Sequence, residues 1–463
     1  MKSNLNFNFK YKMTFNRIIL FILLFLPFSA LAQIAGEPAV KNAFSLEEAQ
    51  LYALQNNLNI SNSRLDEEIA RKKIAETRAI GLPQVDGQVN FQKFLDIPVQ
   101  LIPAEFFGGP PGTFEEIRFG TNYNLTAQLS VNQLLFDGTY FVGLKAAAVY
   151  AELSQRQTHL SELDVKLNVE KAYFTALLSS TNLQFMQRNM EEAERQLFET
   201  QQLYENGFVE QLDVDRLQLN LNNLENQINA LERQKDAARL LLKFQMGYPM
   251  ADDILLTDSL ERFANEPASP VAEGDYTSNR IEYQLLQTQA ELQKLNTQSY
   301  NVSYLPSISG SFIHQQVAQR NEFNFTQSGY PWFPSTILGV TLRLPIWDSF
   351  TKSAQIQQSK LELEKILNQQ DNLSESVSLE VAQARNDLLT AQEQFATQEQ
   401  NLELAERIHE KSNIKYKEGV GSSLELSTAQ SSFYQTQTNY FTALYELLIA
   451  RAELQKATGQ YAD

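Results

Sequence analysis

The chain has 463 residues, of which 43% are hydrophobic and 20% charged, a composition typical of folded rather than disordered proteins. Its formal net charge of -17 disfavours nucleic acid and anionic lipid as binding partners. The absence of cysteine excludes disulfides, cysteine metal sites, thiol nucleophiles and lipid attachment through cysteine.

The start of the sequence has the pattern of a signal peptide. Four basic residues precede a short apolar run from Ile18 to Leu26, and Ala30-Leu31-Ala32 supplies the small residues that signal peptidase requires. We expect residues 1–32 to be cleaved, which takes the formal net charge from -17 to -21 because four positive charges leave. A membrane anchor is the alternative, but the run is shorter than the ~20 apolar residues that span a bilayer. No later stretch is predicted to form a transmembrane helix.

Two long windows predict unusually long helices. Proline is absent between Pro111 and Pro249 and again after Pro345, and both windows are rich in helix-forming residues. Residues 144–203 fit one unbroken helix of about 60 residues, on the order of 90 Å long. Helices of this length favour coiled-coil packing. Two mostly apolar stripes repeat at heptad spacing: Leu217, Leu221, Leu224, Ile228 and Leu231, and then Ala429, Phe433, Thr436, Tyr440, Ala443 and Leu447.

The two stripes are offset by 212 residues, which indicates an internal repeat. Tyr204 and Gly207 match Tyr416 and Gly419 at the same offset. We therefore expect two copies of a unit made of helix, strand, loop, strand, long helix, turn and helix. The predicted boundaries are 33–247 for the first repeat, 248–280 for a linker, 281–457 for the second repeat and 458–463 for a short tail.

Four segments alternate apolar with polar residues, as β-strands with one apolar face do. They begin near Val85, Tyr123, Ile308 and Leu338. The alternation fits either a soluble β-sandwich or a membrane barrel with a wet interior. Each segment lasts about 9–11 residues, the length of a tilted membrane strand, and the export signal agrees, so we favour the membrane. The lipid face is predicted to include Val89, Phe91, Leu125, Leu129, Phe312, Val340, Leu342 and Leu344.

Aromatic residues cluster at the ends of these segments, where membrane proteins place them at the interface. They are Phe94, Phe136, Tyr304, Trp332, Phe333 and Trp347. Four strands are too few to close a barrel, since bacterial barrels start at about eight strands and an open edge in lipid is costly. Several subunits must therefore share one barrel. The irregular segments 97–120 and 318–335 are expected on the extracellular side, and the long helices in the periplasm.

Several motifs resemble those of the TolC-like outer-membrane efflux family. Residues 45–57 resemble its opening helix, and residues 134–138 and 345–349 resemble its junctions between strand and helix. The Tyr-x-x-Gly motifs at Tyr204 and Tyr416 resemble its two hairpin tips. The resemblance covers nearly all of the mature chain.

The resemblance implies a mainly α fold with a small membrane β part. Three protomers would each give four strands to a 12-stranded barrel, and their helices would continue as a periplasmic α-barrel. Such homotrimers are implied to work with a periplasmic adaptor protein and an inner-membrane pump, in contact with outer-membrane lipid and without nucleic acid or cofactor.

The resemblance also implies a gate at the periplasmic hairpin tips. Asp213 matches a tip aspartate of the family, Tyr416 matches its tyrosine partner, and Glu425 matches an acidic ring position. Two positions depart from the pattern, because Gly421 replaces a latch arginine of the best-known member and Thr428 replaces a second ring aspartate. We therefore expect a weaker or differently built closing network.

The tip residues also have a purely structural interpretation. Gly207 and Gly419 fall where long helices break, and so suit left-handed helix ends. Asp213 and Glu425 fall at the next helix starts, where carboxylates cap free N–H groups. Capping and a channel role can coexist.

Catalytic and metal motifs are missing from the sequence. His159, His314 and His409 lack ligand spacing, and there is no phosphate loop or nucleophile elbow, so no enzyme, catalytic residue or metal is predicted. The preferred function is a passive outer-membrane conduit for efflux of small molecules such as drugs or metals. The alternatives are the channel of a type I protein secretion system and, from another class, a soluble periplasmic coiled-coil scaffold.

Overall fold

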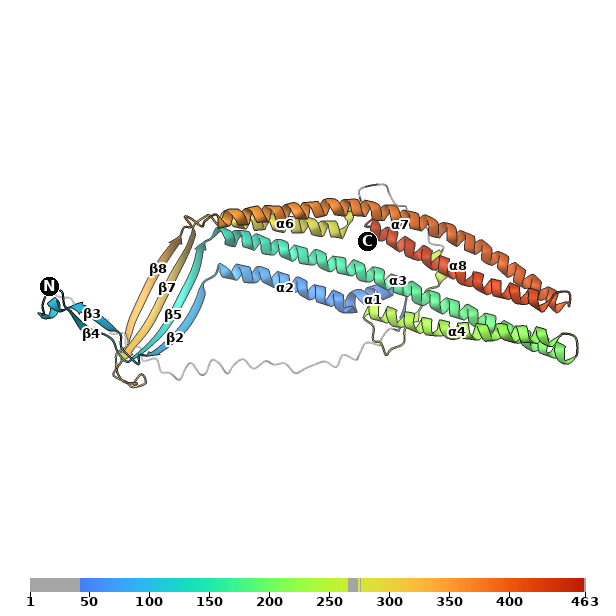
Figure 1. Cartoon of the computed structure of the whole chain (residues 1–463), viewed down its shortest axis with the longest axis horizontal. Helices are drawn as coiled ribbons and strands as arrows, with labels where there is room; N and C mark the ends of the chain where they lie inside the picture. Colours follow the sequence, from blue (N-terminus) through green and yellow to red (C-terminus); the bar gives the residue numbers. More distant parts are fainter. Residues whose placement is uncertain (1–41, 265–273, 275, 462–463) are drawn as a thin grey trace, which may run out of the picture. The chain divides into compact units, whose positions relative to one another are not determined.

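The computed structural model describes residues 42–264, 274 and 276–461, so the expected signal peptide at 1–32 lies outside the described residues. The protein is mainly helical with one four-stranded sheet, which confirms the predicted fold class (Figure 1). The first copy of the repeat contains α1 (Leu46–Asn56), α2 (Leu58–Ile80), β2 (Gln84–Lys93), β5 (Tyr123–Phe136), α3 (Gly138–Glu205) and α4 (Gln211–Met246). The second contains α6 (Ile281–Val302), β7 (Ser307–Arg320), β8 (Phe333–Arg343), α7 (Thr351–Lys417) and α8 (Ser423–Ala457).

Two helices, one in each copy, exceed the length of ordinary globular helices. Helix α3 has 68 residues and α7 has 67, each on the order of 100 Å long. Asp137 caps the start of α3 by accepting hydrogen bonds from the backbone N–H of Thr139 and Tyr140. Helix α4 packs along α3 and α8 packs along α7, so that each copy ends in a helical hairpin. Among the described residues, no helix combines the length and apolar character needed to cross a bilayer.

The four long strands form one antiparallel sheet in the order β2-β5-β7-β8. Strand β2 follows α2 and β7 follows α6, whereas β5 leads into α3 and β8 leads towards α7. All four strands therefore meet helices at the same end of the sheet. Strands β2 and β8 are its two edges in the described chain.

Three details of the predicted strand region need correction. The segment 97–120 is not irregular, because it contains a hairpin of β3 (Val99–Pro103) and β4 (Phe114–Arg118) around a short 3-10 helix, Ala104–Phe107. The second irregular segment is shorter than predicted, since β7 reaches Arg320 and β8 begins at Phe333. Leu344 lies one residue beyond the end of β8, because Pro345 cannot donate a strand hydrogen bond.

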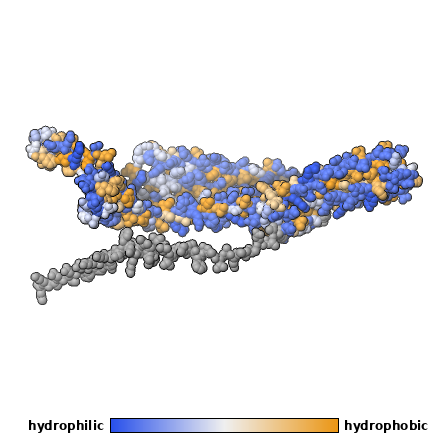
Figure 2. Space-filling model, turned by 90° about the horizontal axis from the view of Figure 1, so that it is seen from below, coloured by the Kyte–Doolittle hydropathy of each residue, from blue (hydrophilic) through white to orange (hydrophobic). Residues whose placement is uncertain are grey.

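Apolar side chains hold each hairpin together. Leu183, Met186 and Ala193 of α3 pack against Leu224 and Ile228 of α4. Between α7 and α8 the core contains Val377, Val381, Ala384, Leu388, Ala391, Leu447, Ala450, Leu454 and Ala457. Figure 2 shows hydrophobic side chains interspersed among hydrophilic ones over the visible surface of the helices. Coiled-coil packing, predicted from the heptad stripes, is thus consistent with the buried seam of each hairpin.

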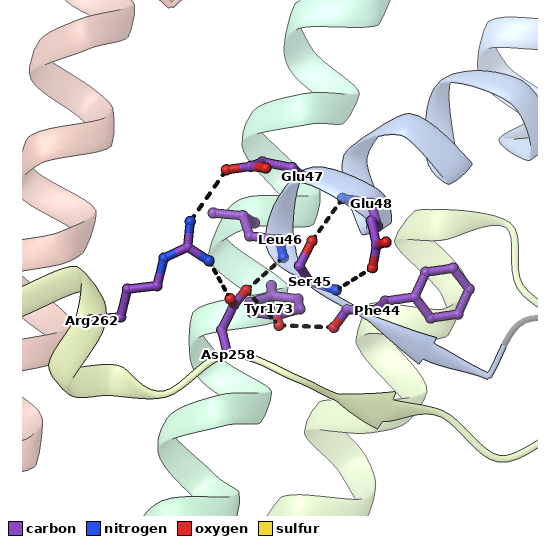
Figure 3. Close-up of polar contacts among 8 residues, drawn as sticks. All are labelled: Phe44, Ser45, Leu46, Glu47, Glu48, Tyr173, Asp258 and Arg262. Carbon is purple, nitrogen blue, oxygen red and sulfur yellow. Dashed lines mark hydrogen bonds and ion pairs between the residues drawn. The ribbon is translucent and has the colours of Figure 1, made fainter.

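The linker between the copies returns to the first residues of the described chain. Strand β6 (Leu255–Leu256) pairs in parallel with β1 (Ala43–Phe44), and α5 (Leu260–Ala264) follows. The Asp258 carboxylate lies among three donors (Figure 3): the backbone N–H of Leu46 at 2.8 Å, the Tyr173 hydroxyl at 2.9 Å and the Arg262 guanidinium at 2.5 Å.

This cluster fixes the first helix against α3. Ser45 and Glu48 form a capping box at the start of α1, so the N–H groups of its first turn are satisfied both locally and by Asp258. Tyr173 is fully buried, and its hydroxyl also donates to the Phe44 carbonyl at 3.0 Å. Burial, together with the hydrogen bond to Asp258, raises the pKa of Tyr173. Sequence reasoning did not predict this cluster, because its three parts, residues 44–48, Tyr173 and residues 258–262, are 85 or more residues apart in the sequence.

Candidate functional site

The two hairpin ends have the same local build. Helix α3 ends at Glu205 and α7 ends at Lys417, and a glycine with left-handed backbone follows two residues later in each case. Gly207 has φ 80° and Gly419 has φ 75°, a conformation that is strained for residues with a Cβ atom. The Tyr204 carbonyl accepts from the Gly207 N–H at 2.9 Å, and the Tyr416 carbonyl from the Gly419 N–H at 3.0 Å. The Tyr204 side chain remains partly exposed.

The two acidic tip residues occupy equivalent positions, three residues after the caps of α4 and α8. Asp213 accepts from the Glu210 N–H at 3.2 Å. The Glu425 N–H donates to the Ser422 hydroxyl at 3.1 Å, and the Glu425 carboxylate accepts from Lys415 at 2.9 Å. The Asp213 carboxylate thus caps a backbone N–H as expected, whereas Ser422 caps α8 and the Glu425 carboxylate pairs with Lys415 instead.

The contacts between the hairpins differ from the pairing that the resemblance implied. The Tyr416 hydroxyl lies 3.1 Å from the Thr200 hydroxyl, and not at hydrogen-bond distance from Asp213. Asp213 instead accepts a short hydrogen bond from Ser423 of the other hairpin. Burial raises the pKa of Tyr416, and the nearby Asp213 charge raises it further.

An arginine from an unexpected position joins this network. Arg216, one turn after Asp213, donates to Ser423 at 3.1 Å and lies 4.0 Å from the Asp213 carboxylate. One turn further, Asn220 donates to Ser427 at 2.6 Å. The sequence analysis did not identify these residues, because an arginine and serines on helix surfaces usually indicate only solvation. Their shared hydrogen-bonding with Asp213 appears only when the hairpins are placed side by side.

The two departures from the family pattern have local explanations. A Cβ atom at Gly421 would lie 3.0 Å from the Lys415 Cβ and from the Tyr416 backbone nitrogen, so a larger side chain requires the turn to shift. Thr428 donates to the Leu424 carbonyl at 2.8 Å within its own helix. It also lines, with Glu425, a groove of about 620 Å³ between α7 and α8.

Beyond the tips, polar side chains cross the buried boundary between α3 and the second hairpin. Asn189 donates to Gln437 at 2.9 Å, and Gln196 donates to Asn413 at 2.8 Å. Gln430 also donates a short hydrogen bond to Gln196, and these two residues are only 2% and 4% exposed. We call these contacts the inter-hairpin rungs: Asn189–Gln437, Gln196–Asn413, Gln196–Gln430 and Thr200–Tyr416.

A buried histidine lies beside the rungs. His409 is 6% exposed and stacks on Phe433 with ring centroids 5.3 Å apart and planes 1° from parallel. Its Nε2 atom has no hydrogen-bond partner among the described residues. Burial lowers the pKa of His409, against the opposing charges of Glu192, Glu410 and Glu406. Within the part of the chain that the structure describes, no three His, Cys, Asp or Glu side chains cluster closely enough to hold a metal ion.

The strand register places the predicted lipid-facing residues of the four strands on one face of the sheet. Phe91 lies opposite Leu125, Val89 opposite Ala127, and Phe312 opposite Leu338. Val89, Leu338 and Val340 are 72%, 81% and 71% exposed, as expected for side chains without a protein core. Leu129, Val340 and Leu342 share this face through the same register.

This apolar face contains an unpredicted polar cluster. His314 on β7 lies opposite Leu129, and its Nδ1 atom is 2.7 Å from the Thr336 hydroxyl of β8. Gln316 lies 3.4 Å from the other ring nitrogen. The alternation of β7 thus loses its apolar character after Phe312, which the sequence pattern, followed only to that residue, did not show.

A family model described as "Outer membrane efflux protein" matches the chain twice, at residues 52–248 and 282–460. The chain is 22% identical over 426 residues to the alkaline protease secretion protein AprF of Pseudomonas aeruginosa, covering 90% of this chain and 85% of AprF. It is 22% identical over 446 residues to the outer membrane protein TolC of Salmonella enteritidis, covering 92% and 84%. The solved structure of CusC matches with a TM-score of 0.71 at 14% identity, covering 89% of this chain and 92% of CusC. The double match confirms the internal repeat.

Proposed function

The chain belongs to the outer membrane efflux protein family, and we propose that three copies of it form one passive conduit for small molecules through the outer membrane. The family is one of outer-membrane channels with periplasmic helices and not of enzymes, which sets aside the soluble scaffold as an alternative. Within this proposal residues 1–32 are removed on export, and the repeats span 33–247 and 281–457 with 248–280 between them.

One observation carries the proposal: a four-stranded sheet with two open edges and two unlike faces. One face is apolar and exposed, and the other is built largely from Gln, Asn, Ser and Thr side chains. A bilayer supplies no hydrogen-bond partners to the edges β2 and β8, so neighbouring copies must pair with them. Three copies give 12 strands, a size that bacterial barrels reach. The polar face then lines a water-filled passage.

The hairpin ends form the proposed gate. Asp213, Arg216 and Ser423 join the two hairpins through hydrogen bonds between two half-buried side chains and the buried Ser423 hydroxyl, and these bonds exchange for bonds to water when the hairpins separate. Lys415 and Glu425 connect α7 to α8 within one hairpin, so that this ion pair travels with the hairpin. Tyr204, Gly207 and Gly419 define the turns that such a motion would leave intact.

A periplasmic adaptor protein and an inner-membrane pump complete the proposed assembly. The groove between α7 and α8 is a surface to which helices of an adaptor could pack, since Leu404, Ile408 and Leu424 contribute apolar contacts within it. The groove ends beside Glu425, and an adaptor seated there would therefore contact the gate directly.

Protein secretion is the second candidate function. Its support is the similarity to AprF, whose name states a role in alkaline protease secretion. The two functions use the same channel and differ in the partner pump and the cargo. Expression in a bacterium that lacks its own channel separates them, because efflux lowers the accumulation of a fluorescent dye, whereas secretion moves a protease into the medium.

Conductance in a planar bilayer tests the conduit. Detergent-extracted protein should give discrete conductance steps with a preference for cations, because the mature chain is strongly acidic. Glu425→Ala should change the conductance or weaken the cation preference. The matched control is Glu364→Ala, which removes the same charge from an exposed position on α7 far from the tip. Folded oligomers that give no conductance under any condition would contradict the proposal.

A further inference from the structure

The polar face of the sheet carries only two charged side chains in the described strands. Asp86 lies on the edge strand β2, and Arg343 is the last residue of the other edge strand, β8. Every other position on this face holds an uncharged residue. Both side chains are exposed, and neither forms an ion pair or side-chain hydrogen bond within the part of the chain that the structure describes. Because the two opposite charges lie on opposite edges of the sheet, each is placed to interact with a neighbouring copy of the chain.

Within one chain the two charges cannot meet. The register sets Asp86 opposite Ser130, Ile313 and Ile337 in turn across the sheet. Three strand spacings of about 4.8 Å therefore separate the two edges. Arg343 also lies six residues beyond Ile337, towards α7.

A closed barrel brings the two edges together at a calculable offset. Four strands spaced about 4.8 Å apart and tilted about 35–45° rise about 13–19 Å along the strands, which is about four to six residues at about 3.4 Å each. Only an even offset keeps polar side chains on the inner face, because neighbouring residues point to opposite faces. The permitted offsets are thus about four or six residues.

The direction of the offset follows from how the strands end. Gln84, the first residue of β2, lies level with Gly339 across the sheet, so β8 runs past the start of β2 on the side of the helices. The apolar face continues there, since Leu342, Leu344 and Ile346 are 64%, 56% and 89% exposed. The overhanging part of β8 therefore pairs with the start of β2 of the next copy.

We propose that Asp86 of one copy and Arg343 of the next form an ion pair at each seam of the barrel. An offset of six sets the two residues directly opposite each other. An offset of four would set them diagonally, about 7–8 Å apart, which is too far for a disulfide between the two positions, so the ion pair proposed here commits to the offset of six. The pair lies on the wetted face, so it contributes more to register and partner choice than to affinity. This inference rests on the proposed shared barrel and adds the register of its seams.

Cysteine cross-linking tests the seam directly, since the chain has no native cysteine. The double variant Asp86→Cys/Arg343→Cys should form covalent dimers and trimers on oxidation, because a disulfide needs Cα atoms within about 7 Å and the two sites of one chain are too far apart. The matched control Asp86→Cys/Ile337→Cys places both sites level in one chain and should stay uncrosslinked. Denaturing gels without reductant give the readout.

Each outcome has a separate meaning. Oligomers that cross-link through position 337 and not 343, or through neither, would overturn the proposed register while the shared barrel stands. A parent protein that is monomeric before oxidation would overturn the shared barrel and the seam with it. As a second measurement, Asp86→Arg or Arg343→Asp alone should lower the temperature at which oligomers dissociate. The combined variant Asp86→Arg/Arg343→Asp should restore it, because the exchanged charges again attract.

Discussion

The seam inside each hairpin and the boundary between the hairpins near their tips are built from different chemistry. Inside the second hairpin, Leu388, Leu447 and Leu454 form an apolar seam. Between the hairpins, the buried contacts near the tips are made by Gln196, Gln430 and other amide and hydroxyl groups of the inter-hairpin rungs, whereas nearer the sheet Phe185 of α3 packs on Phe441 of α8. Apolar seams resist separation because they expose hydrocarbon to water, whereas paired polar groups exchange one hydrogen bond for another. The difference indicates two stiff hairpins whose boundary is suited to repeated opening at the tips.

The largest effect is expected when the apolar seam inside a hairpin is weakened. Leu447→Ala removes a side chain that is 2% exposed and should cost about 2–5 kcal/mol of stability. Circular dichroism during heating should show a lower Tm. Leu389→Ala, an exposed position on α7, is the control and should leave the Tm nearly unchanged. Equal effects of the two substitutions would show that the seam does not hold the hairpin.

The inter-hairpin rungs should respond differently. Gln196→Ala leaves the buried Gln430 amide without its partner, which should cost about 1–3 kcal/mol. The double variant Gln196→Leu/Gln430→Leu removes both partners of this bond and should recover most of that loss, because the remaining partner of Gln196, Asn413, is only half-buried and can bond to water. It should also open less often in single-channel recordings, because the boundary has become apolar. If the double variant is as unstable as Gln196→Ala, or if its channel opens as often as that of the parent, the polar boundary does not favour separation of the hairpins.

Acid should destabilise the second hairpin through His409, which stacks on Phe433 between α7 and α8. Its pKa in the folded protein is lowered by burial, so the unfolded chain binds the proton more tightly. The free energy of unfolding is therefore independent of His409 above the unfolded pKa of about 6.5, and it decreases as the pH falls below this value. His409→Phe keeps a ring against Phe433 but cannot titrate. Between about pH 7.5 and about pH 5, a range around the unfolded pKa, the Tm of the parent should fall more steeply than the Tm of His409→Phe. Parallel curves of Tm against pH would exclude His409 as the cause.

The smallest effect is expected at the ion pair within the second tip. Lys415 and Glu425 side chains are 56% and 45% exposed, so their pairing should contribute about 0–1 kcal/mol. Lys415→Ala should hardly change the Tm. It should nevertheless strengthen cation preference in bilayer recordings, because it leaves the Glu425 charge uncompensated. A large fall in Tm would show that this pair supports the fold.

Local patterns in the sequence predicted the helices and strands, but they could not predict contacts between residues far apart in the sequence. Proline-free windows predicted α3 and α7, and alternation predicted all four strands of the sheet. The hairpin of β3 and β4 was missed because Gly and Pro between 108 and 112 dominate the segment. Arg216 and Ser423 were missed because 207 residues separate them, and neither side chain has a distinctive local context.

The candidate site shows the same division. The backbone roles of Gly207 and Gly419 follow from residue type and from the breaks in helical pattern. The hydrogen-bond partner of Tyr416 cannot be predicted in this way, because Thr200 and Asp213 lie on different helices and only the packing of the hairpins decides which of them is near. The inter-hairpin rungs were not predicted, since glutamine and asparagine on helices are usually exposed and their spacing carries no distinctive signal.

The central claim is that one chain cannot seal its own sheet and that three copies together complete the wall. Native mass spectrometry of the detergent-extracted protein, with the detergent removed in the gas phase, measures the number of chains directly. The account predicts a single species of three mature chains. A stable species of one chain that stays dissolved without detergent, with β2 and β8 unpaired by any partner copy, would contradict it.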